Sequence, residues 1–337
     1  MSDTEIVVPP TPAAGQPARG GTAWTQRLRT LPASTAVGVF LLLTALAFSL
    51  ASDQFLTSGN TTTIVATASV TMLAALGQLL VVISGGFDLS IGGVVPLAAV
   101  VFAKTAGAGA GPVQAVLAAL AVGVLVGLVH TVFIVKLGIN PLITTLATMS
   151  VAAGVAFTVA DGQTVPVPAS AGGLGDAFLG TLPWHVLLTA AAVGLLHIVL
   201  RHTLFGRRLY MVGGNPEAAR LAGVRTILIG ASVYILSGVL AALAGVVLAS
   251  QVLAASGGIG TDVTMQSLAA IVLGGAALTG GRGSVVGAVF GVLLLGVIAD
   301  GMSILLVPSF YQQIVTGLVL LAAVSLSRFQ ERSRSAG

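Results

Sequence analysis

The chain contains no cysteine among its 337 residues, and only 7% of them are charged and 5% aromatic. The lack of cysteine excludes a disulfide scaffold, thiolate metal ligands and thiol catalysis. A soluble domain carries about 25% charged residues, so the few charges here cannot cover a water-exposed surface. The 14 basic residues are scattered along the chain and form no binding patch, so the net charge of +4 does not predict a nucleic-acid partner.

Hydrophobic residues instead make up 56% of the chain, and glycine occurs 44 times. This composition predicts an all-α membrane protein in which glycine lets helices approach closely, with lipid around it. A helix needs about 20 apolar residues to cross the roughly 30 Å of hydrocarbon. Ten stretches are candidates: 34–51, 61–84, 91–107, 113–136, 141–160, 184–200, 227–249, 265–280, 284–300 and 309–326. The eighth is short, and the glycine-rich turn that follows it also fits a re-entrant hairpin.

The distribution of charge tests this number of spans, because cytoplasmic loops are enriched in Lys and Arg. With the N-terminus inside and ten crossings, every basic residue except Lys104 falls on the cytoplasmic side. Five carboxylates fall at or near the outer side: Asp53, Asp161, Asp176, Asp262 and Asp300. The sequence therefore predicts a polytopic bundle of about ten transmembrane helices with both termini cytoplasmic.

Three regions follow from this topology. Residues 1–33 are rich in Pro, Gly, Ala and Thr and lack the features of a signal peptide, which predicts a disordered cytoplasmic tail. Residues 34–327 form the transmembrane domain, and residues 328–337 form a second cytoplasmic tail. Within the domain, residues 201–226 are the longest cytoplasmic loop and the richest in charge.

A short helix is predicted inside that loop. Asn215 is a good N-cap, Pro216 suits the first helical position, and Gly223 suits the left-handed conformation beyond the last turn. Glu217 and Arg220 complement the helix dipole or contact a partner. The whole segment consists of Asn215, Pro216, Glu217, Ala218, Ala219, Arg220, Leu221, Ala222 and Gly223. A capped helix outside the membrane and among basic residues is suited to dock against another protein.

Enzyme chemistry finds little support. The chain has no G-x-x-x-x-G-K-[ST] loop for ATP and no nucleophile elbow, and its four histidines lack metal-ligand spacing. We therefore expect no catalytic residue, no metal and no cofactor. The predicted spans also lack the mid-membrane charges typical of ion-coupled carriers, so the energy for transport is expected to come from elsewhere.

Several polar and small residues are candidates for a role inside the membrane, each with an alternative. Asp88 and Ser90 lie in a turn, where one of them is expected to cap the next helix or to shape a path. Gly283, Gly287 and Gly291 recur every fourth residue, which fits close helix packing or a hinge. A possible polar path consists of Asn140, Thr144, Thr145, Thr148, Ser150, Gln266 and Ser267. Hydrogen bonds from such hydroxyl groups to their own helix would explain the Ser and Thr residues equally well.

Five segments in this order resemble the inner-membrane permease subunits of bacterial ribose-type ABC importers for monosaccharides. They are Gly85–Gly93, Asn140–Ser150, Gly213–Gly223, Gly274–Ser284 and Tyr311–Gly317. The resemblance covers about residues 35–327, and Phe87 departs from it where the family usually has Ile. The resemblance makes residues 215–223 the helix that couples the permease to its ATPase.

The resemblance also implies the assembly: a second permease copy, identical or different, two ATPase subunits or domains, and a periplasmic sugar-binding protein. The expected function is import of a ribose-like monosaccharide across the bacterial inner membrane, powered by ATP hydrolysis on a partner chain. Two alternatives remain open at this point. One is a secondary transporter acting alone, and the other is the related ABC permease for branched-chain amino acids or nucleosides.

Overall fold

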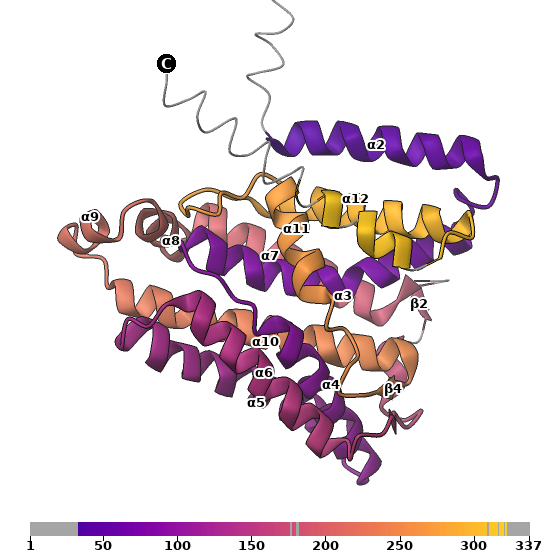
Figure 1. Cartoon of the computed structure of the whole chain (residues 1–337), viewed down its shortest axis with the longest axis horizontal. Coiled ribbons are helices and arrows are strands. Elements are labelled where there is room, and N and C mark those ends of the chain that lie inside the picture. Colours follow the sequence, from indigo (N-terminus) through magenta and orange to yellow (C-terminus); the bar gives the residue numbers. More distant parts are fainter. Residues whose placement is uncertain are drawn as a thin grey trace, which may run out of the picture. The chain divides into compact units, whose positions relative to one another are not determined.

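The computed structural model describes residues 33–175, 177–179, 182–308, 310–315, 317–319 and 321, and these are mainly helical (Figure 1). The long elements are α2 (Ala33–Ala51), α3 (Ser58–Ile83), α4 (Ile91–Gly107), α5 (Pro112–His130), α6 (Pro141–Val159), α7 (Trp184–His202), α10 (Thr226–Val252) and α12 (Val285–Ile304). The shorter helices are η1 (Thr131–Lys136), η2 (Gly172–Gly175), α8 (Leu204–Gly214), α9 (Pro216–Leu221) and α11 (Val263–Leu273). Helix resumes at residues 310–315.

Seven helices in the described part of the chain are long and apolar enough to span a membrane. α4 has 17 residues and α11 only 11. At 1.5 Å per residue α11 rises about 16 Å, which is too short to cross the hydrocarbon alone. The eighth predicted span is therefore a short helix followed by the non-helical segment 274–284. The chain is an all-α membrane protein, with the tenth predicted span only partly within the described residues.

The two strand pairs are minor and lie between helices. β1 (Val165–Pro166) pairs antiparallel with β4 (Ala254–Ala255), which ties the connection after α6 to the one after α10. β2 (Ala177–Leu179) pairs with β3 (Leu182–Pro183) just before α7. Both pairs are too short to form a sheet layer, so helix packing determines the fold.

α3 and α10 form the centre of the bundle. Both helices contribute to two large apolar clusters, one shared with α4 and α5 and the other with α7, α8, α11 and α12. The inner two thirds of α3 are almost entirely buried, including Leu73, Leu76 and Leu80, which have no exposed surface. Because this part of α3 is buried on all sides, its sequence is an apolar run and does not show the pattern of an amphipathic helix.

Glycine permits the closest helix contacts. A Cβ on Gly123 of α5 would lie 2.2 Å from the carbonyl oxygen of Gly238 on α10, and the converse distance is also 2.2 Å. On α12, a Cβ on Gly287 or Gly291 would lie 2.0 or 1.9 Å from a carbonyl oxygen of the α11 segment. Gly283 precedes α12 and contacts side chains of α3, so only two of the three predicted glycines share a helical face.

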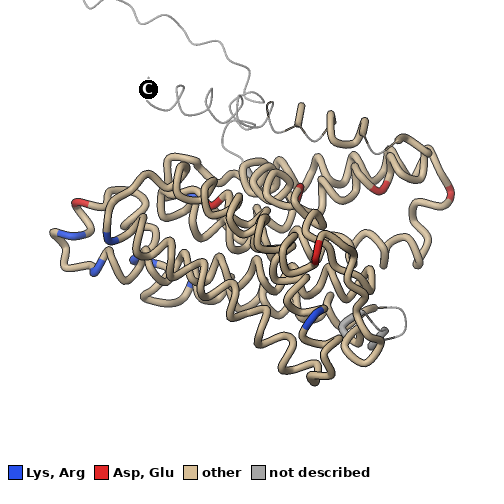
Figure 2. Tube along the Cα trace, turned by 60° about the horizontal axis from the view of Figure 1, so that its bottom comes forward, with Lys and Arg blue, Asp and Glu red and all other residues tan. Residues whose placement is uncertain are grey.

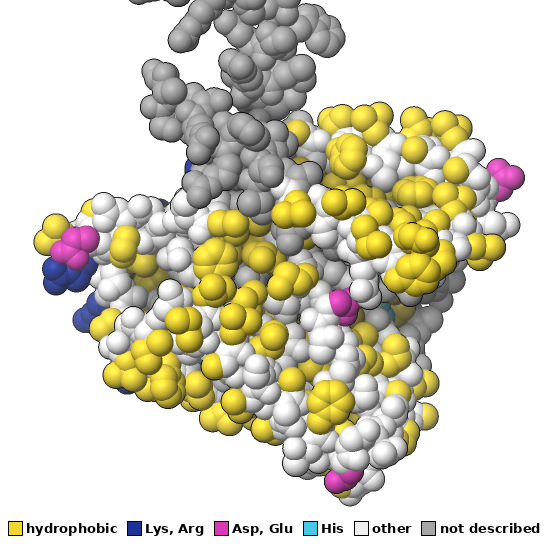
Figure 3. Space-filling model, viewed as in Figure 1, with side chains coloured by type: hydrophobic (Ala, Val, Ile, Leu, Met, Phe, Trp, Pro, Cys, Tyr) yellow, Lys and Arg dark blue, Asp and Glu magenta, His cyan; other side chains and the backbone are white. Residues whose placement is uncertain are grey.

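The outer surface of the bundle carries large apolar side chains (Figure 3). Exposed examples are Leu42 and Leu50 on α2, Leu125 on α5, and Ile143 and Val151 on α6. Such a surface is stable in contact with lipid and would not be stable in water.

Charged residues gather at the ends of the helices (Figure 2). The basic positions cluster at the end where α8 and α9 lie. Lys104 instead bonds to Asp161 at 2.8 Å, near the C-terminal ends of α4 and α6. The two tails, apart from the helical backbone at Ala33, lie outside the described residues, as does Asp176.

Candidate coupling helix and polar groups within the bundle

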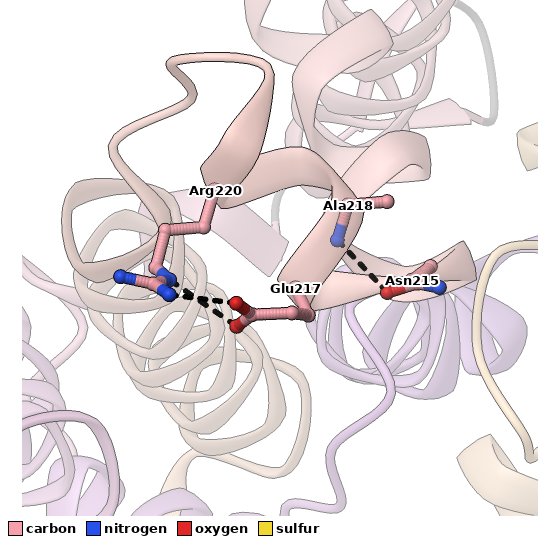
Figure 4. A network of polar contacts seen from close by, with 4 residues as sticks. All are labelled: Asn215, Glu217, Ala218 and Arg220. Atoms are coloured by element: carbon pink, nitrogen blue, oxygen red, sulfur yellow. Dashed lines mark hydrogen bonds and ion pairs between the residues drawn. The ribbon is translucent and has the colours of Figure 1, made fainter.

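The predicted cytoplasmic helix is present as α9, with its caps formed (Figure 4). The Asn215 side chain accepts a hydrogen bond from Ala218 N at 3.0 Å, and Pro216 occupies the first turn, where a backbone donor is not needed. At the other end, Gly223 has φ +81° and its amide donates to Arg220 O at 3.0 Å. Both ends of this six-residue helix are thus fixed by its own sequence.

Glu217 and Arg220 bond to each other across one turn of α9 (Figure 4). Arg220 Nη2 lies 2.6 Å from Glu217 Oε1, and Nε lies 3.2 Å from Oε2. The hydrogen bond to Glu217 raises the pKa of Arg220, so the guanidinium stays charged at any physiological pH. Both side chains are about two thirds exposed, which leaves the outer faces of the carboxylate and guanidinium accessible.

α9 is anchored through one side chain and otherwise exposed. Ala219 is 2% exposed and joins the apolar cluster shared with α7, α8, α11 and α12, while Leu221 is 79% exposed. A small helix that presents an apolar side chain and an ion pair to solvent has the chemistry of a docking surface.

α8 differs from the sequence prediction, which has only loop between residues 201 and 214. α8 buries Leu209 and Val212, with Thr203 as its N-cap, and Arg201 and His202 belong to the last turn of α7. The Tyr210 hydroxyl donates to Gly283 O at 2.8 Å, and burial raises the pKa of Tyr210 so that it remains a neutral donor. The signal was available: Thr203 precedes an apolar pattern of helical spacing.

The C-terminal end of α8 is wedged against two other segments at a glycine junction formed by Gly85, Gly213, Gly280 and Gly281. A Cβ on Gly213 would lie 1.7 Å from Ile83 O, the last residue of α3. Gly281 N donates to that same oxygen at 2.9 Å. A Cβ on Gly280 would lie 2.8 Å from the Cα of Gly85. Three of the sequence motifs therefore meet in backbone contact directly beside α9.

Asp88 is buried in the segment between α3 and α4, where it is 1% exposed. One carboxylate oxygen accepts from Ser90 N at 3.0 Å and Ser90 Oγ at 2.5 Å, and the other accepts from Ser237 Oγ of α10 at 2.7 Å. Ser90 occupies the N-cap position of α4 but its side chain makes no capping bond. The expected capping role is wrong for Ser90, because its hydroxyl is used by Asp88.

Two further polar residues pack near Asp88 without having been predicted. The rings of His130 and Tyr234 meet edge to face with centroids 5.4 Å apart, and both residues are buried. A Cβ on Gly86 would lie 2.6 Å from the Tyr234 hydroxyl oxygen, so this motif glycine leaves room for the phenol. Sequence spacing could not bring these residues together, because they come from two separate helices, α5 and α10, and from the loop between α3 and α4.

The possible path residues of α6 bond to their own helix. Asn140 caps α6 by accepting from Leu142 N at 2.8 Å. Four hydroxyl groups donate to carbonyl oxygens four residues earlier: Thr144, Thr145, Thr148 and Ser150. Ser267 is buried and donates to Thr264 O. Among the described residues of this set, only Gln266 bonds to other side chains. For the others a role in the path stays a prediction, because hydrogen bonds within the helix explain their hydroxyl groups equally well.

Within the described residues, no group of three or more His, Cys, Asp or Glu side chains could hold a metal ion. The arrangement offers instead an exposed capped helix, a backbone junction leading from it into the bundle, and polar groups between apolar helices.

Comparison with known proteins agrees with this arrangement. The chain is 34% identical to the ribose import permease protein RbsC of Bacillus subtilis (strain 168) over 295 residues, which is 87% of this chain and 91% of that protein. It is 37% identical to the L-arabinose transport system permease protein AraH of Escherichia coli (strain K12) over 275 residues, covering 79% and 81% of the two chains. The model of one family, described as branched-chain amino acid transport system / permease component, matches residues 60–324. From α3 to the helical residues beyond α12, the chain therefore belongs to the family of branched-chain amino acid transport system permease components.

Proposed function

We propose that this chain is the membrane permease subunit of an ATP-driven importer that moves a pentose such as ribose or arabinose into the bacterial cytoplasm. The observation that carries the proposal is the similarity to ribose and arabinose permeases over nearly the whole bundle. The family description names branched-chain amino acids, but both relatives quoted above are named for sugars.

The proposed assembly rests on the similarity to import permeases. The sequence contains no phosphate-binding loop, so we assign ATP hydrolysis to two partner ATPase subunits or domains that dock on α9. A second permease copy, identical or different, completes the membrane part, and a periplasmic binding protein delivers the sugar. The exposed ion pair and Leu221 of α9 support this docking role.

We also propose ten crossings of the inner membrane with both termini cytoplasmic. α9 and the basic residues around it would then face the cytoplasm, and Lys104 with Asp161 would face the periplasm. In this topology α11 and segment 274–284 together make the eighth crossing, and the helix beginning at residue 310 makes the tenth.

The test is to tag this chain, isolate the complex from native membranes, and reconstitute it in liposomes. Ribose or arabinose uptake that requires ATP and the binding protein would support the proposal, and competition among ribose, arabinose, leucine and adenosine would identify the solute class. The chain reconstituted alone should neither hydrolyse ATP nor accumulate sugar. Uptake by this chain alone, driven by a proton gradient, would overturn the proposal in favour of a secondary transporter.

A further inference from the structure

The outer half of α3 exposes a different kind of side chain from the other long helices. Its exposed positions carry only Ser58, Gly59, Thr61, Thr63 and Thr67. By contrast, exposed positions on α2, α5 and α6 carry Leu, Val, Ile and Phe, and no exposed large apolar side chain comes from α3. A face without large apolar groups is a poor partner for lipid chains.

Threonine recurs along this face at helical spacing. Thr63, Thr67 and Thr71 are four residues apart and so lie above one another on one side of α3. The Thr63 and Thr67 hydroxyls donate to Gly59 O and Thr63 O, which leaves their oxygens free to accept from a solute. Such bonding alone would also be compatible with lipid, so the threonines do not decide the question.

The neighbouring short helix supplies groups that are not compatible with lipid. Near the middle of α3, Thr71 Oγ1 donates to Gln266 Oε1 of α11 at 3.1 Å. Gln266 Nε2 donates in turn to Asp262 Oδ2 at 2.6 Å, and Asp262 is exposed. An amide and a carboxylate beside the middle of a spanning helix indicate contact with water or a polar solute rather than hydrocarbon.

The same side of α3 continues inward to Gln78, seven residues beyond Thr71. Gln78 has no exposed surface, and neither its amide oxygen nor its amide nitrogen has a hydrogen-bond partner among the described residues. The hydroxyl group of Thr264 on α11 likewise has no hydrogen-bond partner among the described residues, and Thr264 is 2% exposed. A buried amide without a hydrogen-bond partner destabilises the fold by about 1–3 kcal/mol. We therefore expect the Gln78 amide to find hydrogen-bond partners in another conformation of the protein.

We propose that Thr63, Thr67, Thr71, Gln78 and Gln266 form the surface along which a neutral polyhydroxylated solute crosses the membrane. The proposal rests on the proposed import function and assigns its path to α3 and α11. The exposed threonines form the open outer part, the Thr71–Gln266 pair lies at mid-depth, and Gln78 lies in the closed inner part. When the closed part opens, the Gln78 amide offers one donor pair and one acceptor to the hydroxyl groups of the solute.

The absence of native cysteine makes labelling a direct test in the assembled complex. Thr63→Cys and Thr67→Cys should react with a membrane-impermeant methanethiosulfonate added outside. Thr44→Cys is the matched control, because Thr44 also bonds to its own helix but lies on α2 among exposed leucines. Only a thiolate in water reacts well, so we expect Thr67→Cys to react at least about tenfold faster than Thr44→Cys. Equal rates would overturn the proposal.

Uptake gives a second, independent readout. Labelled Thr67→Cys should lose most of its ATP-driven uptake, and Gln78→Leu should reduce uptake several-fold while the complex still assembles. Thr44→Val should leave uptake unchanged. Normal uptake by labelled Thr67→Cys would also overturn the proposal. The labelling result does not depend on which solute is carried. A wild-type complex that transports leucine rather than ribose would therefore contradict the proposed function and the polyhydroxylated solute, whereas a reactive Thr67→Cys would still place the path on α3. Ribose uptake by the complex together with an unreactive Thr67→Cys would support the proposed function and contradict the proposed path.

Discussion

At the scale of single residues, the carboxylate of Asp88 has the most demanding surroundings. It accepts three hydrogen bonds, from one backbone amide and two serine hydroxyls, in a site that is 1% exposed. The two serines come from segments separated by 147 residues in the sequence, so the carboxylate joins the start of α4 to the middle of α10. Any change that replaces its acceptors with donors acts on both helices.

Asp88→Asn should therefore destabilise the protein by about 2 kcal/mol, because the new amide group would face hydroxyl and amide donors in a buried site. Thermal unfolding of the purified complex in detergent measures this as a lower midpoint. Asp161→Asn is the control, since its side chain is 79% exposed and surface pairs contribute less than about 1 kcal/mol. Equal effects of the two substitutions would contradict the structural role of Asp88.

At the scale of elements, the glycine junction links α8 to the end of α3 and to the turn before α12. Gly213→Ala should disrupt this junction, because the added methyl carbon would lie 1.7 Å from Ile83 O, a backbone atom that cannot move alone. We expect a lower unfolding midpoint and reduced ATP-driven uptake.

Gly214→Ala is the matched control for that prediction. It is the next residue of the same helix, and a Cβ there would meet nothing within 4 Å. Alanine is a better helix former than glycine, so this substitution should be neutral or slightly stabilising. If Gly213→Ala were equally harmless in both measurements, the junction would not be a rigid contact.

Ala219→Pro should uncouple ATP hydrolysis from transport if α9 is the docking helix. Proline at this position removes the bond from Ala219 N to Asn215 O, and a proline inside a helix costs about 3 kcal/mol. α9 meets the apolar clusters of the bundle through Ala219, so insertion and expression should persist while uptake and solute-stimulated ATP hydrolysis collapse. Reversing the charge of Glu217 or Arg220 should do less, because both are exposed. Normal uptake by an assembled Ala219→Pro complex would make α9 a mere connection.

The sequence predicted α9 in detail because its caps are local: Asn215, Pro216 and Gly223 act on neighbours within one turn. The sequence also located the long helices, because each of them is a run of apolar residues long enough to be recognised without knowledge of the packing. It could not predict the Asp88–Ser237 contact, the glycine junction or the Gln266–Thr71 pair, since each depends on packing between segments far apart in the chain. The polar residues of α6 were chosen on residue type alone, which does not distinguish a path from hydroxyl groups bonded to their own helix.

At the scale of the whole molecule, the separation of charge predicts which ends of the helices face which compartment. Gly111→Cys, between α4 and α5, should be labelled in intact cells by an impermeant maleimide. Ala222→Cys, just after α9, should be labelled only after the membrane is permeabilised. A reporter fused after Arg328 should give a cytoplasmic signal. Labelling of Ala222→Cys in intact cells would rule out the proposed orientation.

The shortness of α11 has a consequence for how the chain is made. Eleven residues do not provide enough apolar length for a translocon to release the segment into lipid by itself. Its packing partners are α3, synthesised long before it, and α12, synthesised immediately after it through the glycine contacts. We therefore expect α11 to enter the membrane together with α12 rather than alone, and to be held there by its contacts with α3. Slowing translation after residue 304 should favour correct insertion, whereas separating α11 from α12 by a long hydrophilic linker should leave α11 stranded at the periplasmic surface.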